Sequence, residues 1–465
     1  MNIREYFERG PEAWKIWKAA QKGIVSLIGV DFKGLCLAKF DFSGCLFDDC
    51  KFRDVKFDGC DFRNAKFIRT CVIKECHFSG CKMTAIDANG VRFDEVVFHE
   101  VIAIGANISS ADINNCIFKE SNFDKILARY THVNNTSMRS SSFNNGDFYR
   151  CEIRKSNISQ STFSGSDMTG STWSVVDGRQ SVFIKCNFAS AEMHRFHGFQ
   201  SNFKSSHWTN SILKTSDFRR ANFEDCKMDG STVRGCSFGS ATMPFMKWIN
   251  FSVADCDLRR AEISDSTFEN GKIKDCRIYG LAAWGVKFSQ VEQSDLDISS
   301  KRDISIKCIS VEYGIVISHF LHNESIKKYF ETLSDKVVLI LGRFTPSRKV
   351  FLEIIRYELK NAGYVPVLFD FDKPDTKDLT ETVLALALSS RAICADLSDP
   401  RCIPHELAVI APNVTAIIHT LIETGHEPYA MFEDLLGRYR VIRRPLIYGD
   451  AEQLRGHCTA MIACL

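Results

Sequence analysis

The sequence predicts a two-domain protein in which a long array of short repeats is followed by an α/β domain. Two observations support this prediction. Large apolar residues recur every five positions through most of residues 30–300, and short apolar runs alternate with helical segments after residue 336. A chain of 465 residues is long enough to bury a core in each of two domains.

Charge and hydropathy exclude several classes of protein. Lys and Arg number 59 against 57 Asp and Glu, so nothing in the net charge favours a nucleic acid or an anionic membrane as partner. The first ten residues, MNIREYFERG, are charged and contain no apolar secretory segment, and no run approaches the roughly 18 apolar residues that span a bilayer. We therefore expect a cytoplasmic protein with neither nucleic-acid nor membrane partners.

Residues 1–29 are expected to form an N-terminal helical cap. Residues 11–22 read as a helix, with Pro11 in its first turn and Trp14 and Trp17 on one face. An array of stacked repeats leaves an open, apolar end, and such an end must be covered.

The five-residue period runs from Phe32 to Phe67 without interruption. One extra residue then enters, because the next large apolar residue is Ile73, and the period continues from there to Ile298. The residue two positions before each large one is mostly Cys, Ala or Ser. A period of five fits neither an α-helix, with 3.6 residues per turn, nor a simple strand, with a period of two.

This pattern resembles that of the pentapeptide-repeat family, whose motif is A(D/N)LXX. Ala111-Asp112-Ile113 and Ala221-Asn222-Phe223 are two close matches. The resemblance implies a right-handed quadrilateral β-helix over residues 30–300, with four repeats in each coil. It implies about 13 coils, which at ~4.8 Å per coil make a β-solenoid on the order of 65 Å long. The large residues fill its axis and the small ones its corners.

The 19 cysteines fit the same pattern, since most of them occupy the small-residue positions. No CxxC pair occurs, so we interpret them as small, buried free thiols and expect no metal site. His194, His197 and His207 are interpreted as surface residues, because the family's geometry places 197 and 207 on opposite faces.

Two glycines stand where the pattern demands large residues. Gly178 and Gly198 lack the central side chain, but Val176 and Phe196, two residues before them, are larger than usual. The sequence therefore predicts that Phe196 and Val176 supply the missing volume.

Residues 301–335 are expected to cap the solenoid and to connect it to the second domain. Residues 303–318 are β-branched and alternating, which favours a strand, and residues 319–334 read as a helix.

Residues 336–465 show five strand patterns with helices between them, which indicates a doubly wound parallel sheet. The predicted strands are 337–341, 365–369, 392–395, 415–419 and 440–446, and the predicted helices are 346–362, 377–390, 403–411, 427–437 and 450–463. The first strand is followed by neither a Walker loop nor a GxGxxG motif. It also lacks the acidic pair of a phosphoacceptor domain.

The second domain resembles the Toll/interleukin receptor (TIR) family, which implies a flavodoxin-like, TIR-like fold with a five-stranded parallel sheet. The matching segments are Gly342-Arg343-Phe344, Phe369-Asp370-Phe371-Asp372-Lys373-Pro374, Ser389-Ser390-Arg391, Ile393-Cys394-Ala395-Asp396-Leu397-Ser398 and His405-Glu406-Leu407. Nucleoside deoxyribosyltransferases resemble this region too, with a carboxylate at a similar place. Pro404-His405 departs from the Trp-containing stretch of many TIR proteins.

By this resemblance Glu406 is the catalytic residue for cleavage of NAD, which would be a substrate and not a bound cofactor. Cleavage passes through an oxocarbenium-like state, which a fixed carboxylate stabilises. Glu406 can also be read as a helix-terminal acid, and Asp396 as a turn residue. The residues expected to contact the nucleotide are Arg343, Phe344, Arg348, Asp370, Ser390 and Asp396.

Two functions are compatible with this organisation. In the first, the protein is a bacterial effector, linked by resemblance to antiphage defence, in which the solenoid senses a trigger or assembles and the TIR-like domain cleaves a nucleotide after self-association. In the second, it is a non-catalytic scaffold that binds an unknown protein partner. Mimicry of DNA is disfavoured, because acidic and basic residues are nearly equal in number along the repeats.

Overall fold

The computed structural model describes residues 3–68, 71–300, 305–322, 336–343, 345–370, 383–384, 386–399 and 403–464. The chain divides into two compact units. The first comprises Met1–Lys272 and Trp284–Val291, and the second comprises Ile273–Ala283 and Glu292–Leu465. Among the described residues, no helix is long and apolar enough to cross a membrane.

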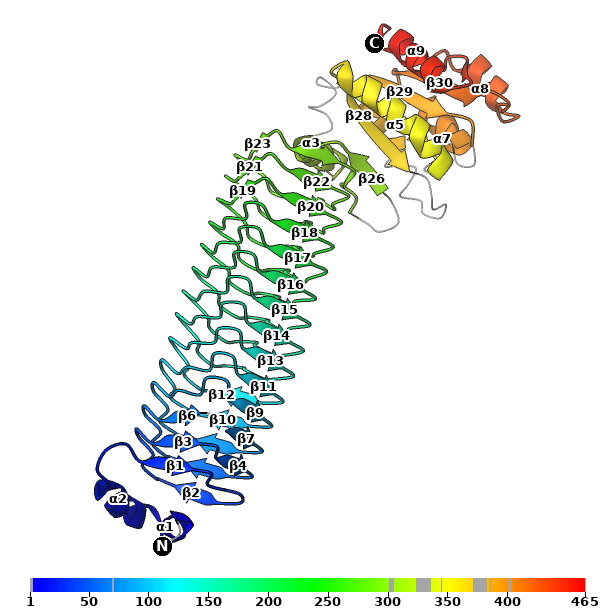
Figure 1. Ribbon diagram of the computed structural model, residues 1–465. Coiled ribbons are helices and arrows are strands. Elements are labelled where there is room, and N and C mark those ends of the chain that lie inside the picture. The colour runs from blue at the N-terminus through cyan, green and yellow to red at the C-terminus, as the bar shows by residue number, and fades with distance from the viewer. Residues whose placement is uncertain are drawn as a thin grey trace. The chain divides into compact units, whose positions relative to one another are not determined.

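Two helices cover the N-terminal end of the first unit (Figure 1): α1 (Ile3–Glu8) and α2 (Pro11–Ala19). The indole of Trp14, fully buried on α2, donates a hydrogen bond of 2.6 Å to the carbonyl oxygen of Asp41. Phe7 on α1 packs against Phe32 with ring centroids 5.0 Å apart. The helix predicted over residues 11–22 is present as α2, and α1 is an additional element that sequence analysis did not find.

The repeats form three-residue strands that stack in parallel along the first unit (Figure 1). One face carries β4 (Lys51–Arg53), β7 (Val72–Lys74), β9 (Arg92–Asp94), β11 (Asp112–Asn114), β13 (His132–Asn134), β14 (Glu152–Arg154), β15 (Thr172–Ser174), β16 (Glu192–His194), β17 (Ile212–Lys214), β18 (Thr232–Arg234) and β20 (Ser252–Ala254). A second carries β2 (Cys36–Ala38), β5 (Lys56–Asp58), β8 (His77–Ser79), β10 (Val97–His99) and β12 (Ile117–Lys119). Shorter stacks are β1 (Ser26–Ile28), β3 (Leu46–Asp48) and β6 (Lys66–Ile68), and β19 (Lys247–Ile249), β21 (Thr267–Glu269) and β23 (Lys287–Ser289).

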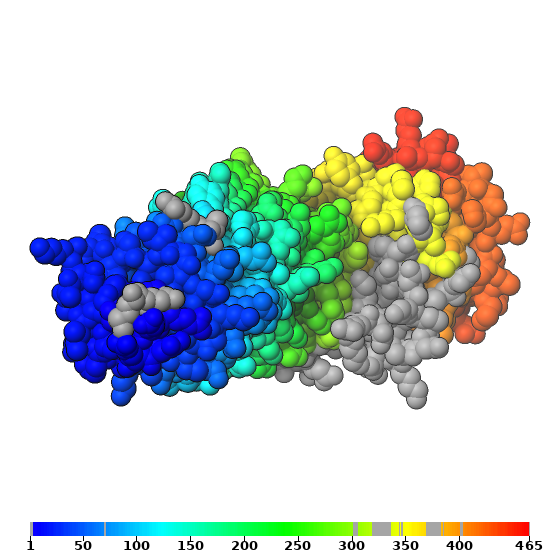
Figure 2. Space-filling model, turned by 60° about the horizontal axis from the view of Figure 1, so that its bottom comes forward, coloured from blue at the N-terminus to red at the C-terminus, as the bar shows by residue number. Residues whose placement is uncertain are grey.

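The strand register confirms four repeats per coil. Ile113 pairs with Val133, twenty residues later, and isolated bridges with the same spacing join the remaining repeats. Phe52 pairs instead with Ile73, so one coil holds an extra residue at the predicted place. Because successive coils stack on one another, the colour in Figure 2 changes in chain order along the surface of the first unit.

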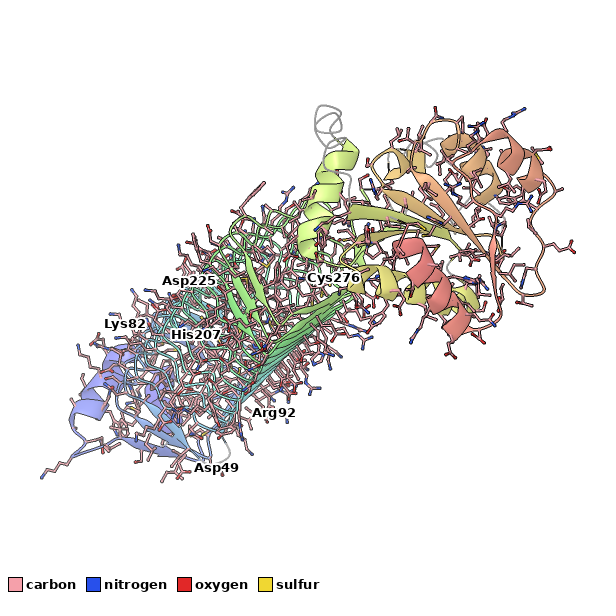
Figure 3. All side chains as sticks on the ribbon, turned by 90° about the horizontal axis from the view of Figure 1, so that it is seen from above. Asp49, Lys82, Arg92, His207, Asp225 and Cys276 are labelled. Carbon is pink, nitrogen blue, oxygen red and sulfur yellow. The ribbon has the colours of Figure 1, made fainter. Side chains whose placement is uncertain are left out.

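Large side chains fill the axis of the solenoid, small ones such as Ser161 are buried beside them, and most charged ones lie outside. Phe183 and Phe203 of successive coils stack with centroids 5.0 Å apart and rings 2° from parallel. Lys82 and Arg92 are exposed on different sides of the rod (Figure 3). His197 and His207 belong to separate columns of bridges, in agreement with their predicted separation.

The predicted exchange of volume is confirmed for Phe196, which serves both axial glycines, whereas none of the atoms nearest to either position belongs to Val176. A Cβ on Gly178 would lie 2.3 Å from the ring of Phe196, and one on Gly198 would lie 2.8 Å from the same ring. The buried Phe196 ring therefore occupies the space that both missing side chains leave.

The second unit begins with the last repeats, which include β24 (Glu292–Ser294) and most of β22 (Lys272–Lys274). β25 (Leu296–Asp297) pairs antiparallel with β26 (Ser305–Cys308), and α3 (Val311–His322) follows. A Cβ on Gly314 of α3 would lie 2.7 Å from the Ile278 side chain, so α3 packs directly on the last repeats.

The predicted strand over 303–318 and helix over 319–334 are therefore wrong in their boundaries. The strand ends at Cys308 and the helix begins at Val311, because packing against the last repeats outweighs the β-propensity of its branched residues. Residues 323–335 lie outside the described residues.

Seven strands form the sheet of the second unit, in the order β25-β26-β28-β27-β29-β30-β31. Five are parallel, as expected: β27 (Val337–Gly342), β28 (Val365–Asp370), β29 (Ala392–Asp396), β30 (Ile417–Glu423) and β31 (Leu446–Tyr448). The sheet is nevertheless mixed, because β26 pairs antiparallel with β28. The helices of this part include α5 (Pro346–Asn361), α7 (Ile403–Ile410), α8 (Phe432–Arg438) and α9 (Ala451–Ile462), and the predicted helix over 377–390 lies partly outside the described residues.

The last strand departs most from its predicted range, 440–446. Val441 and Arg443 make only bridging hydrogen bonds to Ile418, and the strand itself begins at Leu446, after Pro445. Proline has no N–H to donate, so it interrupts a ladder.

Candidate functional site

Polar residues gather where three parallel strands of the α/β sheet end. Asp396, Glu423 and Tyr448 are the last residues of β29, β30 and β31. The carboxyl ends of parallel strands meet at one edge of a sheet, where α/β proteins bind ligands. We call this edge the carboxyl edge.

Arg348, in the first turn of α5, joins these three strand ends. Its guanidinium donates hydrogen bonds of 2.9 and 2.6 Å to Oδ2 of Asp396, and it also contacts the Glu423 carboxylate and the Tyr448 hydroxyl. Arg348 is only 5% exposed. Burial disfavours its charge, but Asp396 and Tyr448 more than compensate and hold the pKa of Arg348 above its usual value.

Ser398 completes this network from the loop after β29. Its hydroxyl donates to Asp396 Oδ1 at 2.7 Å and accepts from the Glu423 amide at 2.8 Å. The buried charges are thus paired and hydrogen-bonded, as such groups must be in a protein interior. Arg348 consequently lies in a closed network, and Asp396 is one of its partners.

Arg343 lies at the same edge, just after β27. It forms an ion pair of 2.6 Å with Asp399, in the loop after β29, and both side chains are about a quarter exposed. A partly exposed guanidinium at this edge is accessible to a ligand from solvent, and its fork of donors suits anionic groups.

Glu406 lies in the first turn of α7, the helix that follows β29. The residue is only 3% exposed, and its Oε2 has no hydrogen-bond partner among the described residues. Burial raises the pKa of this carboxyl group, and the nearby His405 only partly opposes the rise. A buried polar atom without a partner is costly and points to a group that is absent from the structure.

The remaining predicted residues do not all join this group. Asp370 ends β28 and pairs in register with Gly342, so it reaches the carboxyl edge. Ser390 precedes β29 and donates a hydrogen bond of 2.7 Å to the Leu386 carbonyl oxygen, so it lies at the opposite edge of the sheet. Phe344 lies outside the described residues.

Sequence analysis missed Glu423 and Tyr448. Both are strand-terminal polar residues, which is the signal that could have identified them, but the predicted strands ended before either was reached. No three His, Cys, Asp or Glu side chains are placed to hold a metal in the described part of the α/β sheet and its helices.

Two family models match the solenoid. Residues 42–87 match a model described as pentapeptide repeats in nine copies. Residues 76–123, 134–170 and 199–235 match a second, described as pentapeptide repeats in eight copies. These segments are therefore pentapeptide repeats, in agreement with the period in the sequence. No curated protein sequence matches the chain.

The solved structures with some similarity to this chain have low sequence identity to it. The plasmid-mediated fluoroquinolone resistance protein QnrB1 is 16% identical, with a TM-score of 0.24 over 47% of this chain and 93% of its own. HetL from the cyanobacterium Nostoc, a pentapeptide-repeat protein involved in regulating heterocyst differentiation, is 14% identical, with a TM-score of 0.19 over 64% and 98%. The A-module of a mannuronan C-5 epimerase from Azotobacter vinelandii is 11% identical, with a TM-score of 0.22 over 61% and 94%. Similarity at this level carries no information about function.

Proposed function

We propose that this pentapeptide-repeat protein is a cytoplasmic effector whose TIR-like α/β domain cleaves NAD, or a related nucleotide, at its N-glycosidic bond. The solenoid senses a trigger or assembles copies of the protein. Antiphage defence is the biological setting that we propose.

The observation that carries this proposal is the unpartnered, buried carboxylate of Glu406. When the bond between the ribose C1′ and the nicotinamide nitrogen breaks, its electron pair moves to the pyridinium, and positive charge develops on the ribose. A carboxylate that is already desolvated stabilises this charge strongly, because no water has to be displaced. Water then adds to C1′ and releases a proton, which completes hydrolysis.

The two arginines receive different roles in this proposal. Arg348 already contacts two carboxylates and a tyrosine hydroxyl, so we assign it the positioning of the strand ends and not contact with the pyrophosphate. Arg343 is partly exposed at the same edge, and we assign it to the pyrophosphate, which guanidinium groups bind well.

Nicotinamide release by the full-length protein tests the proposal. Glu406→Gln keeps the shape of the side chain and removes its charge, so the rate should fall on the order of 10²–10³-fold, as it does when one preorganised electrostatic group is lost. Glu433→Gln is the matched control, because Glu433 is also an acid in the first turn of a helix but is exposed. It should keep the wild-type rate.

If Glu406 acts only as a helix-terminal acid, the two variants will behave alike, and the catalytic assignment fails. One observation favours the alternative of a non-catalytic scaffold, namely that the guanidinium of Arg348 is already bound by carboxylates. Absence of nicotinamide release by every variant, measured in crowded solution where the protein self-associates, would favour that scaffold.

A further inference from the structure

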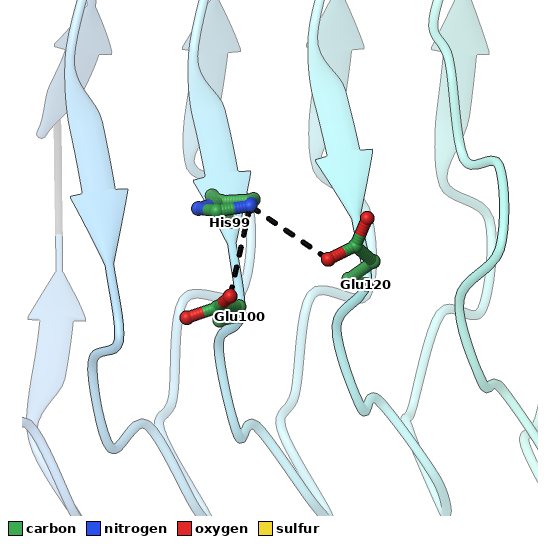
Figure 4. Close-up of side chains that lie close together, drawn as sticks. All are labelled: His99, Glu100 and Glu120. Atoms are coloured by element: carbon green, nitrogen blue, oxygen red, sulfur yellow. Dashed lines mark ion pairs between the residues drawn. The ribbon is translucent and has the colours of Figure 1, made fainter.

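Three metal-ligating side chains meet on the surface of the solenoid (Figure 4). His99 ends β10, Glu100 follows it, and Glu120 follows β12 one coil later. The Nε2 atom of His99 lies 3.9 Å from Oε1 of Glu100 and 3.9 Å from Oε2 of Glu120. The three donor atoms lie within 4.8 Å of one another.

The backbone fixes the spacing of these side chains. His99 pairs in register with Lys119, and the Glu100 amide donates a hydrogen bond of 3.1 Å to the Lys119 carbonyl oxygen. Glu100 and Glu120 have the same left-handed conformation, with φ of 54° and 51°. The two carboxylates therefore start from equivalent positions, separated by one strand spacing of about 4.8 Å.

A second histidine on the solenoid shows what distinguishes this cluster. His132 also has two carboxylate neighbours, but Asp112 lies 3.3 Å from its Nδ1 and Glu152 lies 3.9 Å from its Nε2. Carboxylates on opposite nitrogens of one ring cannot share an ion with it. At His99 both carboxylates approach the same nitrogen, so all three ligands converge on one point.

We propose that His99, Glu100 and Glu120 bind a divalent first-row transition metal ion, such as Zn²⁺. Bonds of about 2.1 Å hold neighbouring ligand atoms roughly 3–3.4 Å apart. The observed 3.9 Å therefore requires only a small closure by two glutamate side chains that are 62% and 52% exposed. An imidazole ligand favours zinc, nickel or copper over magnesium and calcium, and water fills the remaining coordination positions.

The positive charge of Lys119 opposes metal binding at this cluster. Its Nζ lies 3.5 Å from Oε1 of Glu120, whereas Oε2 faces His99. The lysine leaves the ligating oxygen accessible, but its positive charge repels a cation. Removing that charge should tighten binding, an effect that a merely structural role for the three ligands would not produce.

The experiment is a titration of the full-length protein with Co²⁺, a spectroscopic substitute for Zn²⁺ that distinguishes nitrogen and oxygen ligands from thiolates. Wild type should bind one ion without thiolate absorption. His99→Ala and Glu120→Gln should weaken this binding by at least about tenfold, which is what loss of even an outer-shell partner costs a metal site. Lys119→Gln should strengthen it, and His132→Ala, the matched control, should leave it unchanged.

Equal effects of His99→Ala and His132→Ala, no effect of His99→Ala, or no tightening in Lys119→Gln would each overturn the proposal. The four side chains to be replaced are those of His99, Glu120, Lys119 and His132, and all are substantially exposed. Without metal, the variants should therefore have the same melting temperature as wild type. The result is independent of the proposed nucleotide cleavage, since the cluster lies on the solenoid.

Discussion

Arg348 on α5 and Asp396 at the end of β29 are joined by two hydrogen bonds, of 2.9 and 2.6 Å, across 48 residues of sequence. The pair is buried at 6% and 3% side-chain exposure. It ties the first helix of the α/β sheet to the strand that leads into the candidate site. The hydrogen bonds between Arg348 and Asp396 therefore both stabilise the α/β fold and hold the strand end at the candidate site in place.

Replacing Arg348 with Met should destabilise the α/β domain by about 3–5 kcal/mol, because the Asp396 carboxylate would remain buried without a cation and the partly exposed Glu423 carboxylate would lose its partner. Helical circular dichroism during urea unfolding would report this loss. The control is Arg455→Met, whose ion pair with Glu358 is 3.7 Å long and 58% exposed on the arginine side, and which should cost no more than about 1 kcal/mol. Equal losses in both variants would contradict this account.

Glu406→Leu should stabilise the protein at neutral pH by roughly 1–3 kcal/mol, because it removes a buried oxygen without a partner. The pKa of Glu406 is raised in the folded state, so between the unfolded and folded pKa values the folded state binds more protons. Wild-type stability should then fall as pH rises through that window, and the variant should lack this fall. Unfolding curves at several pH values would show it; a destabilised variant would mean that the carboxylate has a partner.

Gly178→Ala should destabilise the solenoid by about 1–3 kcal/mol, because the new methyl group would meet the Phe196 ring at 2.3 Å. Gly239→Ala is the control, since its Cβ would meet nothing closer than 3.6 Å. All six tryptophans precede residue 285, so their fluorescence follows unfolding of the repeats. Phe196→Leu should partly rescue Gly178→Ala; lack of rescue would show that the clash lies elsewhere.

Among the 18 cysteines that the structure describes, only Cys36 and Cys464 should react quickly with an alkylating reagent, because they are the exposed ones. Burial keeps the other described thiols away from the reagent, and it also raises the pKa of several of them, for example to about 11 for Cys45 and about 12 for Cys186. Thiolates are the reactive species. Cys71 tests the effect of burial alone, because a hydrogen bond with Cys50 lowers the pKa of this buried thiol to about 7. Mass spectrometry after brief alkylation would identify the modified sites. After denaturation without reductant, nearly all of the 19 thiols should react, and large shortfalls would indicate disulfides.

The repeats could be predicted almost residue by residue, because each position in the period faces one fixed environment. The extra residue before Ile73 was visible for the same reason. The helix that begins at Val311 could not be predicted from the sequence. Its β-branched residues favour a strand, and only contact with the last repeats reverses that preference. The partners of Arg348 lie 48 to 100 residues away along the sequence. Local sequence patterns do not predict such long-range pairs.

The ladder of coils makes the length of the first unit adjustable in whole steps. Most repeats contact counterparts twenty residues away, such as Phe183 and Phe203. In the coil with one extra residue Phe52 pairs with Ile73, so the stacking of strands continues after an insertion. Duplication or loss of one complete coil would therefore keep every side chain on its own face and change the rod by about 4.8 Å. The length of the solenoid can therefore change by whole coils while the elements at its two ends stay the same.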